Sequence, residues 1–184
     1  MIWFTSDWHF CHKRPSLYEP RGFKNQYEMN EALIRNYNSL VSADDDIYVL
    51  GDCILNDNVT GLRCIKNLKG NIHLIRGNHD SEERMNLYDS CYNIVEICEG
   101  KFLRYSKYHF YLSHYPCLTS NHDDGKPLTA KMINLCGHSH TKDKFADWDK
   151  SLIYHVEVDA HDNKPVSIDN IINDLKKKMS TDEI

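Results

Sequence analysis

The stretch IHLIRGNHD, residues 72–80, joins a mostly apolar run to a short polar one. Ile72, Leu74 and Ile75 favour a buried β-strand. Gly77-Asn78-His79-Asp80 then places an amide, an imidazole and a carboxylate side by side at the end of that strand. Glycine, asparagine and aspartate are also ordinary turn residues, so the run could be a plain turn. Its meaning therefore depends on the residues at the ends of the other strands.

Polar residues come directly after four other predicted strands in the same way, namely residues 2–5, 47–50, 108–112 and 132–136. In open α/β sheets, the loops at the carboxyl ends of strands converge on one crevice. We therefore expect five loops to bring O and N donors together from Asp7, His9, Asp52, Asn78, His114, His138 and His140. On extended backbone, Asp7 and His9 would face the same way and share one ion. Glycines at 51, 77 and 137 would let the backbone turn sharply beside these donors.

The remaining pattern alternates helices and strands, which predicts an α/β fold. Further strands are expected at residues 92–98, 102–105 and 152–158. Helices are expected after the Asn25-x-x-Glu28 capping box, over 59–68 ahead of Gly70, and after a Ser167 cap. Residues 115–131, which include Asp123 and Asp124, form the longest irregular stretch, and long loops are often functional. We expect one domain over 1–184, with a disordered tail from about residue 180.

Composition excludes several classes of protein. The chain has 184 residues, of which 41% are hydrophobic and 27% charged, and it contains neither a basic leader nor an apolar run long enough to span a bilayer. Seven irregularly spaced cysteines without a Cys-x-x-Cys pair favour reduced thiols in a cytoplasm. A net charge of −5 disfavours non-specific nucleic-acid binding. Nothing in the sequence indicates an oligomeric state.

In order and register, the five polar clusters resemble the signature of the calcineurin-like metallophosphoesterases. That signature comprises Asp-x-His, Gly-Asp, Gly-Asn-His-Asp, a His after a strand, and Gly-His-x-His, matched here by residues 7–140. The ending HVEVDAHDNKPVSIDNI, residues 155–171, also looks like the close of small bacterial members. The resemblance implies a sandwich of two mixed β-sheets flanked by helices. It also implies two divalent metals, one held by Asp7, His9, Asp52 and His140, and the other by Asp52, Asn78, His114 and His138.

The expected activity is hydrolysis of a small phosphorylated substrate. A hydroxide bridging the metals would attack phosphorus, while His79 would protonate the leaving oxygen and Asp80 would orient the His79 ring. Carboxylate, imidazole and amide donors suit Mn²⁺, which we favour, and also Fe²⁺, Zn²⁺ or Ni²⁺. His12 and Arg21 are candidates for phosphate contact. Cys11 and Cys53 stand near the donors, but small buried thiols are common, so they are not predicted ligands.

Several alternatives to a phosphodiesterase remain open. A phosphomonoesterase would use the same ion pair and the same acid. A nuclease is disfavoured because DNA-cleaving relatives add domains and basic surface. A non-catalytic scaffold, as in the retromer subunit of this superfamily, is disfavoured because such proteins lose part of the metal set, which is intact here.

Overall fold

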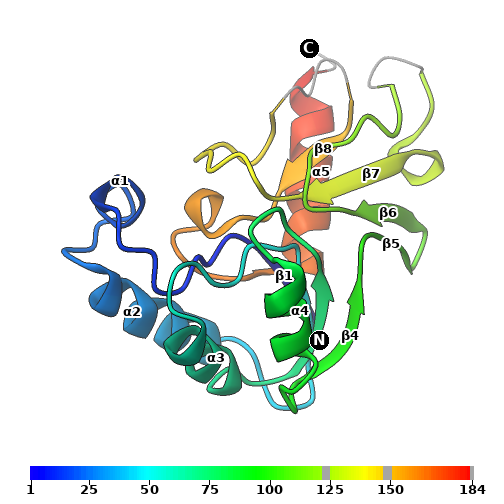
Figure 1. Cartoon of the computed structure of the whole chain (residues 1–184). Helices are drawn as coiled ribbons and strands as arrows, with labels where there is room; N and C mark the ends of the chain where they lie inside the picture. Colours follow the sequence, from blue (N-terminus) through cyan, green and yellow to red (C-terminus); the bar gives the residue numbers. More distant parts are fainter. Residues whose placement is uncertain (122–124, 147–150, 183–184) are drawn as a thin grey trace.

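The structure is a computed structural model that describes residues 1–121, 125–146 and 151–182 (Figure 1). Its first sheet has the strand order β4-β3-β2-β1-β9, and its second has the order β5-β6-β7-β8. The strands of the first sheet are β1 (Ile2–Thr5), β2 (Asp46–Val49), β3 (Asn71–Ile75), β4 (Ile94–Cys98) and β9 (Val166–Ser167). Those of the second are β5 (Lys101–Tyr105), β6 (Tyr108–Leu112), β7 (Met132–Cys136) and β8 (Ile153–His155). Among these strands, β9 in the first sheet and β5 in the second pair antiparallel to their neighbours and the rest pair parallel, so both sheets are mixed.

Two of the longer helices begin at the predicted caps. Asn25 accepts hydrogen bonds from the amides of Tyr27 and Glu28 at the start of α2 (Gln26–Asn38), and Ser167 accepts one from Asn170 at the start of α5 (Ile168–Asp182). The other helices are α1 (Pro15–Tyr18), α3 (Asn58–Lys66) and α4 (Glu82–Tyr88). We did not predict α4 from the sequence, because this short helix buries only Tyr88 and so lacks an apolar stripe.

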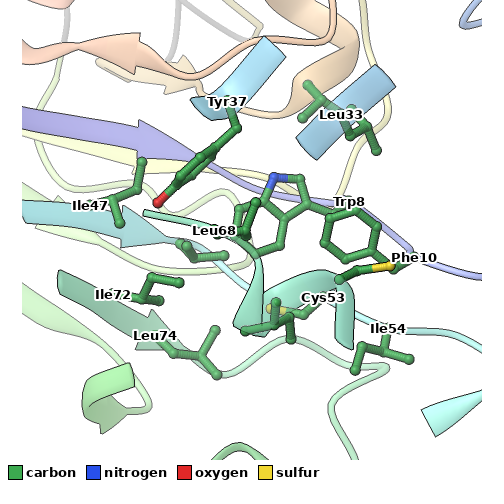
Figure 2. Close-up of a cluster of buried hydrophobic side chains, with 14 of the residues drawn as sticks. Trp8, Phe10, Leu33, Tyr37, Ile47, Cys53, Ile54, Leu68, Ile72 and Leu74 are labelled. Carbon is green, nitrogen blue, oxygen red and sulfur yellow. The ribbon is translucent and has the colours of Figure 1, made fainter. Parts of the chain in front are cut away.

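Two hydrophobic clusters make the sheets into a sandwich. Alternation along β2 sends Ile47 and Val49 to one cluster and Tyr48 and Leu50 to the other. The first cluster lies between the first sheet and the helices α2 and α3, and Figure 2 shows Tyr37, Leu33, Ile47 and Ile72 in it. The second fills the space between the two sheets and includes the buried stripe of α5. The predicted fold of two mixed sheets flanked by helices is confirmed.

A few local predictions were wrong. The strand predicted over 152–158 is limited to β8, because the chain then turns into a short 3₁₀ helix at Val158–Ala160. Val166–Ser167 pairs with β1 as β9, although it is too short to show a strand pattern. In the loop 115–131, Leu128–Ala130 forms a 3₁₀ helix, whereas Asp123 and Asp124 lie outside the described residues. The helix α5 continues to Asp182, past the point where we expected the tail to begin.

Candidate active site

The predicted donors lie together at the carboxyl ends of five strands. Asp7 and His9 follow β1, Asp52 follows β2 and Asn78 follows β3. His114 follows β6, and His138 and His140 follow β7. The first sheet therefore delivers both carboxylates and the amide, while the second sheet delivers three of the four imidazoles. Asp7, His9, Asp52 and His114 are almost completely buried, whereas Asn78, His138 and His140 lie at the open side of the cluster.

One group of donors comprises Asp7, His9 and His140, whose donor atoms all lie within 4.8 Å of one another. His9 Nε2 is 3.1 Å from His140 Nε2 and 3.7 Å from Asp7 Oδ1. His140 Nε2 is 3.8 Å from the same carboxylate oxygen. These distances suit three donors arranged around one cation.

A second group of donors comprises Asp52, Asn78, His114 and His138. Asn78 Oδ1 lies 2.8 Å from His114 Nε2 and 2.9 Å from His138 Nδ1. Asp52 Oδ2 lies 3.6 Å from His114 Nε2 and also 3.5 Å from His9 Nε2 in the first group. Asp52 therefore lies between the two groups, and Asp7 also has a donor atom within 4.8 Å of those of Asp52 and His114.

The proton positions fit cations at this place. His114 Nδ1 lies 2.8 Å from the Leu50 carbonyl oxygen, which can only accept, so the ring carries its proton there and turns the Nε2 lone pair toward Asn78 Oδ1. Two acceptors then face each other. Within the described chain, the buried Asp7 Oδ1 has no hydrogen-bond partner. Buried acceptors that converge without a donor between them are costly unless a cation joins them.

The backbone around the donors adopts an unusual conformation. Asp7, His9, Asp52, His138 and His140 all have positive φ angles, between 46° and 74°. The prediction that Asp7 and His9 share a face of extended backbone was therefore wrong, because two left-handed residues aim them at the same point instead. Such residues cost free energy and cluster at functional sites.

Close approach explains two of the glycines. A Cβ at Gly77 would clash with the Asp52 carboxylate, and a Cβ at Gly137 would clash with the Asp7 carboxylate and the Ser6 hydroxyl. Gly51 has a φ of +89° and lies against Gly77. Glycine is therefore needed at Gly77 and Gly137 for space and at Gly51 also for its conformation.

The titratable groups respond to burial and to one another. Burial raises the pKa of Asp52 above its usual range, although His114 opposes this. Burial also favours the neutral form of Asp7, but the nearby imidazoles of His9, His140 and His114 outweigh it, so the pKa of Asp7 is lowered. For His138, burial and the neighbouring His114 lower the pKa and favour the neutral imidazole that a metal requires.

His79 and Asp80 point in different directions. The His79 side chain is 45% exposed, with Nε2 4.0 Å from Asp52 Oδ2. The prediction that Asp80 orients the His79 ring was wrong, because the Asp80 carboxylate is buried and is directed at the backbone of the turn instead. It accepts hydrogen bonds from the amides of Asp52, Cys53 and Gly77 and from the Tyr88 hydroxyl. Asp80 thus holds the turn that presents Asn78 and His79.

Arg21 is placed differently from the prediction, and His12 lies beside the site. The Arg21 side chain is only 1% exposed, and its five N–H groups are directed at Asp159, at the carbonyls of Asp7 and Trp8, and at Met29 Sδ. No donor is left for a substrate phosphate. The His12 ring centroid lies 5.8 Å from that of His9, and burial, together with neighbouring cationic groups, lowers the pKa of His12 to about 4.

Sequence reasoning missed two carboxylates that support the histidine loop. Glu157 is fully buried and accepts hydrogen bonds from the amides of Ser139 and Thr141. Asp159 accepts one from His140 Nδ1 at 3.0 Å. Their i, i+2 spacing directly after a strand is the signal that could have identified them. Cys11 and Cys53, by contrast, are buried in the first hydrophobic cluster as ordinary core thiols.

Comparisons with known proteins agree with this arrangement. A sequence model described as the calcineurin-like phosphoesterase superfamily domain matches residues 1–157. An uncharacterized protein of Methanocaldococcus jannaschii is 32% identical over 181 residues, covering 96% of this chain and 92% of that protein. The gene 66 protein of Mycobacterium phage L5 is 38% identical over 88 residues, or 46% of this chain and 42% of that protein. The crystal structure of a protein of unknown function from Aquifex aeolicus superimposes with a TM-score of 0.73 at 25% identity, covering 95% of this chain and 98% of that one. Among the described residues, no helix has the length and apolar character required to cross a bilayer.

Proposed function

The chain belongs to the calcineurin-like phosphoesterase superfamily, and on this premise we propose that it hydrolyses small-molecule or nucleotide phosphodiesters with two divalent metal ions. The observation that carries the proposal is the position of Asp52 Oδ2, 3.5 Å from His9 Nε2 in one donor group and 3.6 Å from His114 Nε2 in the other. A carboxylate in this position can serve two ions at once, as in two-metal hydrolytic sites.

In this proposal, Asp7, His9, Asp52 and His140 hold one metal, and Asp52, Asn78, His114 and His138 hold the other. When bound, the ions would supply Lewis-acid activation of the phosphoryl group and a water of lowered pKa. The mixed donor set of carboxylate, imidazole and amide suits Mn²⁺, which we favour, and also Fe²⁺, Zn²⁺ or Ni²⁺. All seven cysteines are free, which supports the cytoplasm as the proposed location.

His79 is the proposed general acid. Its backbone amide donates to Asp52 Oδ1 at 2.8 Å, which fixes the residue beside the donors while its ring remains open to a substrate. An alkoxide leaves poorly without a proton, so an imidazolium placed here would assist the departing oxygen. The Asp80 carboxylate contributes by holding the turn, not by contacting this ring.

A metal-dependence assay on a substrate panel tests the proposal. Purified protein stripped by chelation should lose hydrolysis, and added Mn²⁺ should restore it with about two ions per chain. The panel pairs bis-aryl with aryl phosphate, and cyclic with linear nucleotides. Higher kcat/KM on the diesters supports a phosphodiesterase, whereas higher kcat/KM on the monoesters makes the protein a phosphomonoesterase. Activity that survives thorough chelation and dialysis refutes metal dependence altogether.

A leaving-group comparison tests the role of His79. His79→Ala should leave metal content nearly unchanged and slow an alkyl or nucleoside ester by about 10²- to 10⁴-fold. A nitrophenyl ester, which departs without a proton, should lose much less. Asn78→Ala is the matched control next in sequence, and it should weaken one metal and slow both esters alike. If His79→Ala strips a metal and slows both esters equally, His79 is a ligand and the acid must be sought elsewhere.

A further inference from the structure

Asp159 forms a three-way contact at the edge of the donor cluster. Its Oδ2 lies 3.0 Å from His140 Nδ1 and 2.7 Å from Arg21 Nη2, while its Oδ1 lies 2.9 Å from Arg21 Nε. The Arg21 and Asp159 side chains are 1% and 10% exposed, so this bidentate pair is largely shielded from water. Two parallel charge-assisted hydrogen bonds make the geometry of the pair well defined.

The contact fixes the protonation of His140. A carboxylate accepts only, so the ring carries a proton on Nδ1 and presents the Nε2 lone pair to Asp7 and His9. Arg21 Nη2 also lies 3.3 Å from Nδ1, but two donors cannot share a hydrogen bond, so Asp159 is the partner of His140. A carboxylate behind a ligating histidine orients the ring and increases its basicity.

Arg21 connects this carboxylate to the other side of the same donor group. Its Nη2 donates to the Asp7 carbonyl at 2.9 Å and its Nη1 to the Trp8 carbonyl at 3.2 Å. One buried guanidinium therefore holds both the loop that carries Asp7 and the carboxylate that orients His140. The second donor group is built differently, because His114 is oriented by the uncharged Leu50 carbonyl.

We propose that Asp159, held by Arg21, is a positioning residue that sets the metal affinity of the Asp7, His9 and His140 group selectively. The inference rests on the ligand role of His140 in the proposed function. The asymmetry between a carboxylate behind His140 and a carbonyl behind His114 makes the first group the tighter site and the one that responds to changes at Asp159.

Titration of the metal-free protein with Mn²⁺ alone, followed by calorimetry, separates the sites without any assay of activity. The wild type should bind two ions. His140→Ala should lose one of them. Asp159→Asn should keep both but bind one about 10- to 100-fold more weakly, with the other unchanged. Asp159→Glu, which retains the charge on a longer side chain, should fall between the wild type and Asp159→Asn.

Two controls separate positioning from a general loss of stability. Asp174→Asn removes a carboxylate that binds Lys144 and Tyr154 away from the donor cluster, and it should leave both affinities unchanged. In the metal-free state, ¹⁵N chemical shifts should report the Nδ1–H form of His140 in the wild type and a mixture of tautomers in Asp159→Asn. If Asp159→Asn does not fold, Asp159→Glu carries the same comparison.

The outcomes separate the inference from its premise. If His140→Ala still binds two ions, the proposed ligand set is wrong. If His140→Ala loses an ion but Asp159→Asn and Asp159→Glu bind both with wild-type affinity, the positioning role is wrong. Equal weakening of both ions in Asp159→Asn also overturns the proposal, because selectivity is what distinguishes it.

Discussion

The donor loops and the hydrophobic core beneath them are built from alternate residues of the same segment. Along residues 7–10, Asp7 and His9 turn toward the donor cluster, while Trp8 and Phe10 are 2% and 0% exposed in the first hydrophobic cluster. Figure 2 shows Trp8 and Phe10 next to Cys53 and Ile54, which directly follow Asp52. Each of these donor loops is therefore anchored by the apolar residues next to its ligands.

The two regions differ in what they contribute to folding. Five of the seven donors have positive φ angles, and Asp7 Oδ1 is a buried acceptor without a partner in the described chain, both of which cost free energy. Burial of Trp8 and Phe10 offsets that cost, since each large side chain contributes on the order of 2 to 3 kcal/mol. Function and stability are thus separated residue by residue within one loop, which leads to opposite expectations for neighbouring substitutions.

The largest expected effect is a loss of turnover when Asp52, which lies between the two donor groups, is substituted. Asp52→Asn should lower kcat/KM by about 10³-fold, because loss of a shared charged ligand removes several kcal/mol of transition-state stabilisation. His9→Ala and His138→Ala, which each alter one group, should retain more activity and more metal. Mass-spectrometric metal counts alongside kinetics measure this order. If Asp52→Asn is the mildest of the three variants, the bridging position is misassigned.

The second expected effect is a loss of folding stability when Trp8, one of the apolar residues that anchor the donor loops, is substituted. Trp8→Ala should lower the free energy of unfolding by about 3 to 5 kcal/mol, because it empties a packed site where the ring meets Phe10 and Tyr37 at centroid distances of 5.4 and 5.9 Å. Urea unfolding measures the loss, and metal titration should show weaker binding as well, since Asp7 and His9 flank the missing ring. Leu68→Ala in the same cluster is the control. It should destabilise the fold without weakening metal binding, so equal weakening in both variants would contradict the anchoring role.

This interleaving explains how much the sequence could predict. Apolar strand patterns and the polar residues after them located all seven donors and the positions of most strands along the chain, because both signals are local. The sequence could not predict the orientation of Asp80, the burial of Arg21 or the contact of Asp159 with His140. Arg21 and Asp159 are 138 residues apart in sequence, and only the folded chain brings them together. The left-handed backbone at Asp7 and His9 was missed for a related reason, since neighbouring packing imposes it against local preference.

A third, smaller effect is a dependence of stability on pH that originates outside the donor cluster. Burial lowers the pKa of His161 to about 4 from its usual 6.5, and its Nε2 donates to the His155 carbonyl. Below pH 6.5, His161 therefore binds a proton in the unfolded chain but stays neutral in the folded chain until the pH falls to about 4. His161 should make no pH-dependent contribution above about pH 7 and should destabilise the fold progressively from about pH 6.5 to about pH 4, by at most about 3 kcal/mol.

The measurement is the difference between the wild type and His161→Gln in urea unfolding at about pH 7 and about pH 5, on either side of the usual histidine pKa. Glutamine keeps a donor for the His155 carbonyl but does not titrate. The variant should lose less stability than the wild type on acidification, while the donor histidines titrate equally in both proteins. Parallel pH profiles for the two proteins would show that His161 is not held neutral.

The smallest expected effect has the opposite sign from the largest and comes from the same substitution. Without metal, ionised Asp52 is a buried charge, and its raised pKa means that the fold disfavours the ionised form. Asp52→Asn should therefore raise the stability of the metal-free protein by about 1 kcal/mol. The amide oxygen can keep the hydrogen bond from the His79 amide, and the NH₂ group can donate toward His9 Nε2 or His114 Nε2.

Asp80→Asn is the matched control, because it makes the same chemical change at a buried carboxylate whose acceptor positions are already used. Its oxygens receive hydrogen bonds from the Gly77 and Cys53 amides and the Tyr88 hydroxyl, among others, so an NH₂ group would face donors and cost about 1 to 3 kcal/mol. Urea unfolding of both variants in excess chelator measures the two signs. A loss of metal-free stability in Asp52→Asn would mean that the cluster gains from the carboxylate even without a cation. The cost of the donor loops would then lie in their left-handed backbone and in the unpartnered Asp7 Oδ1.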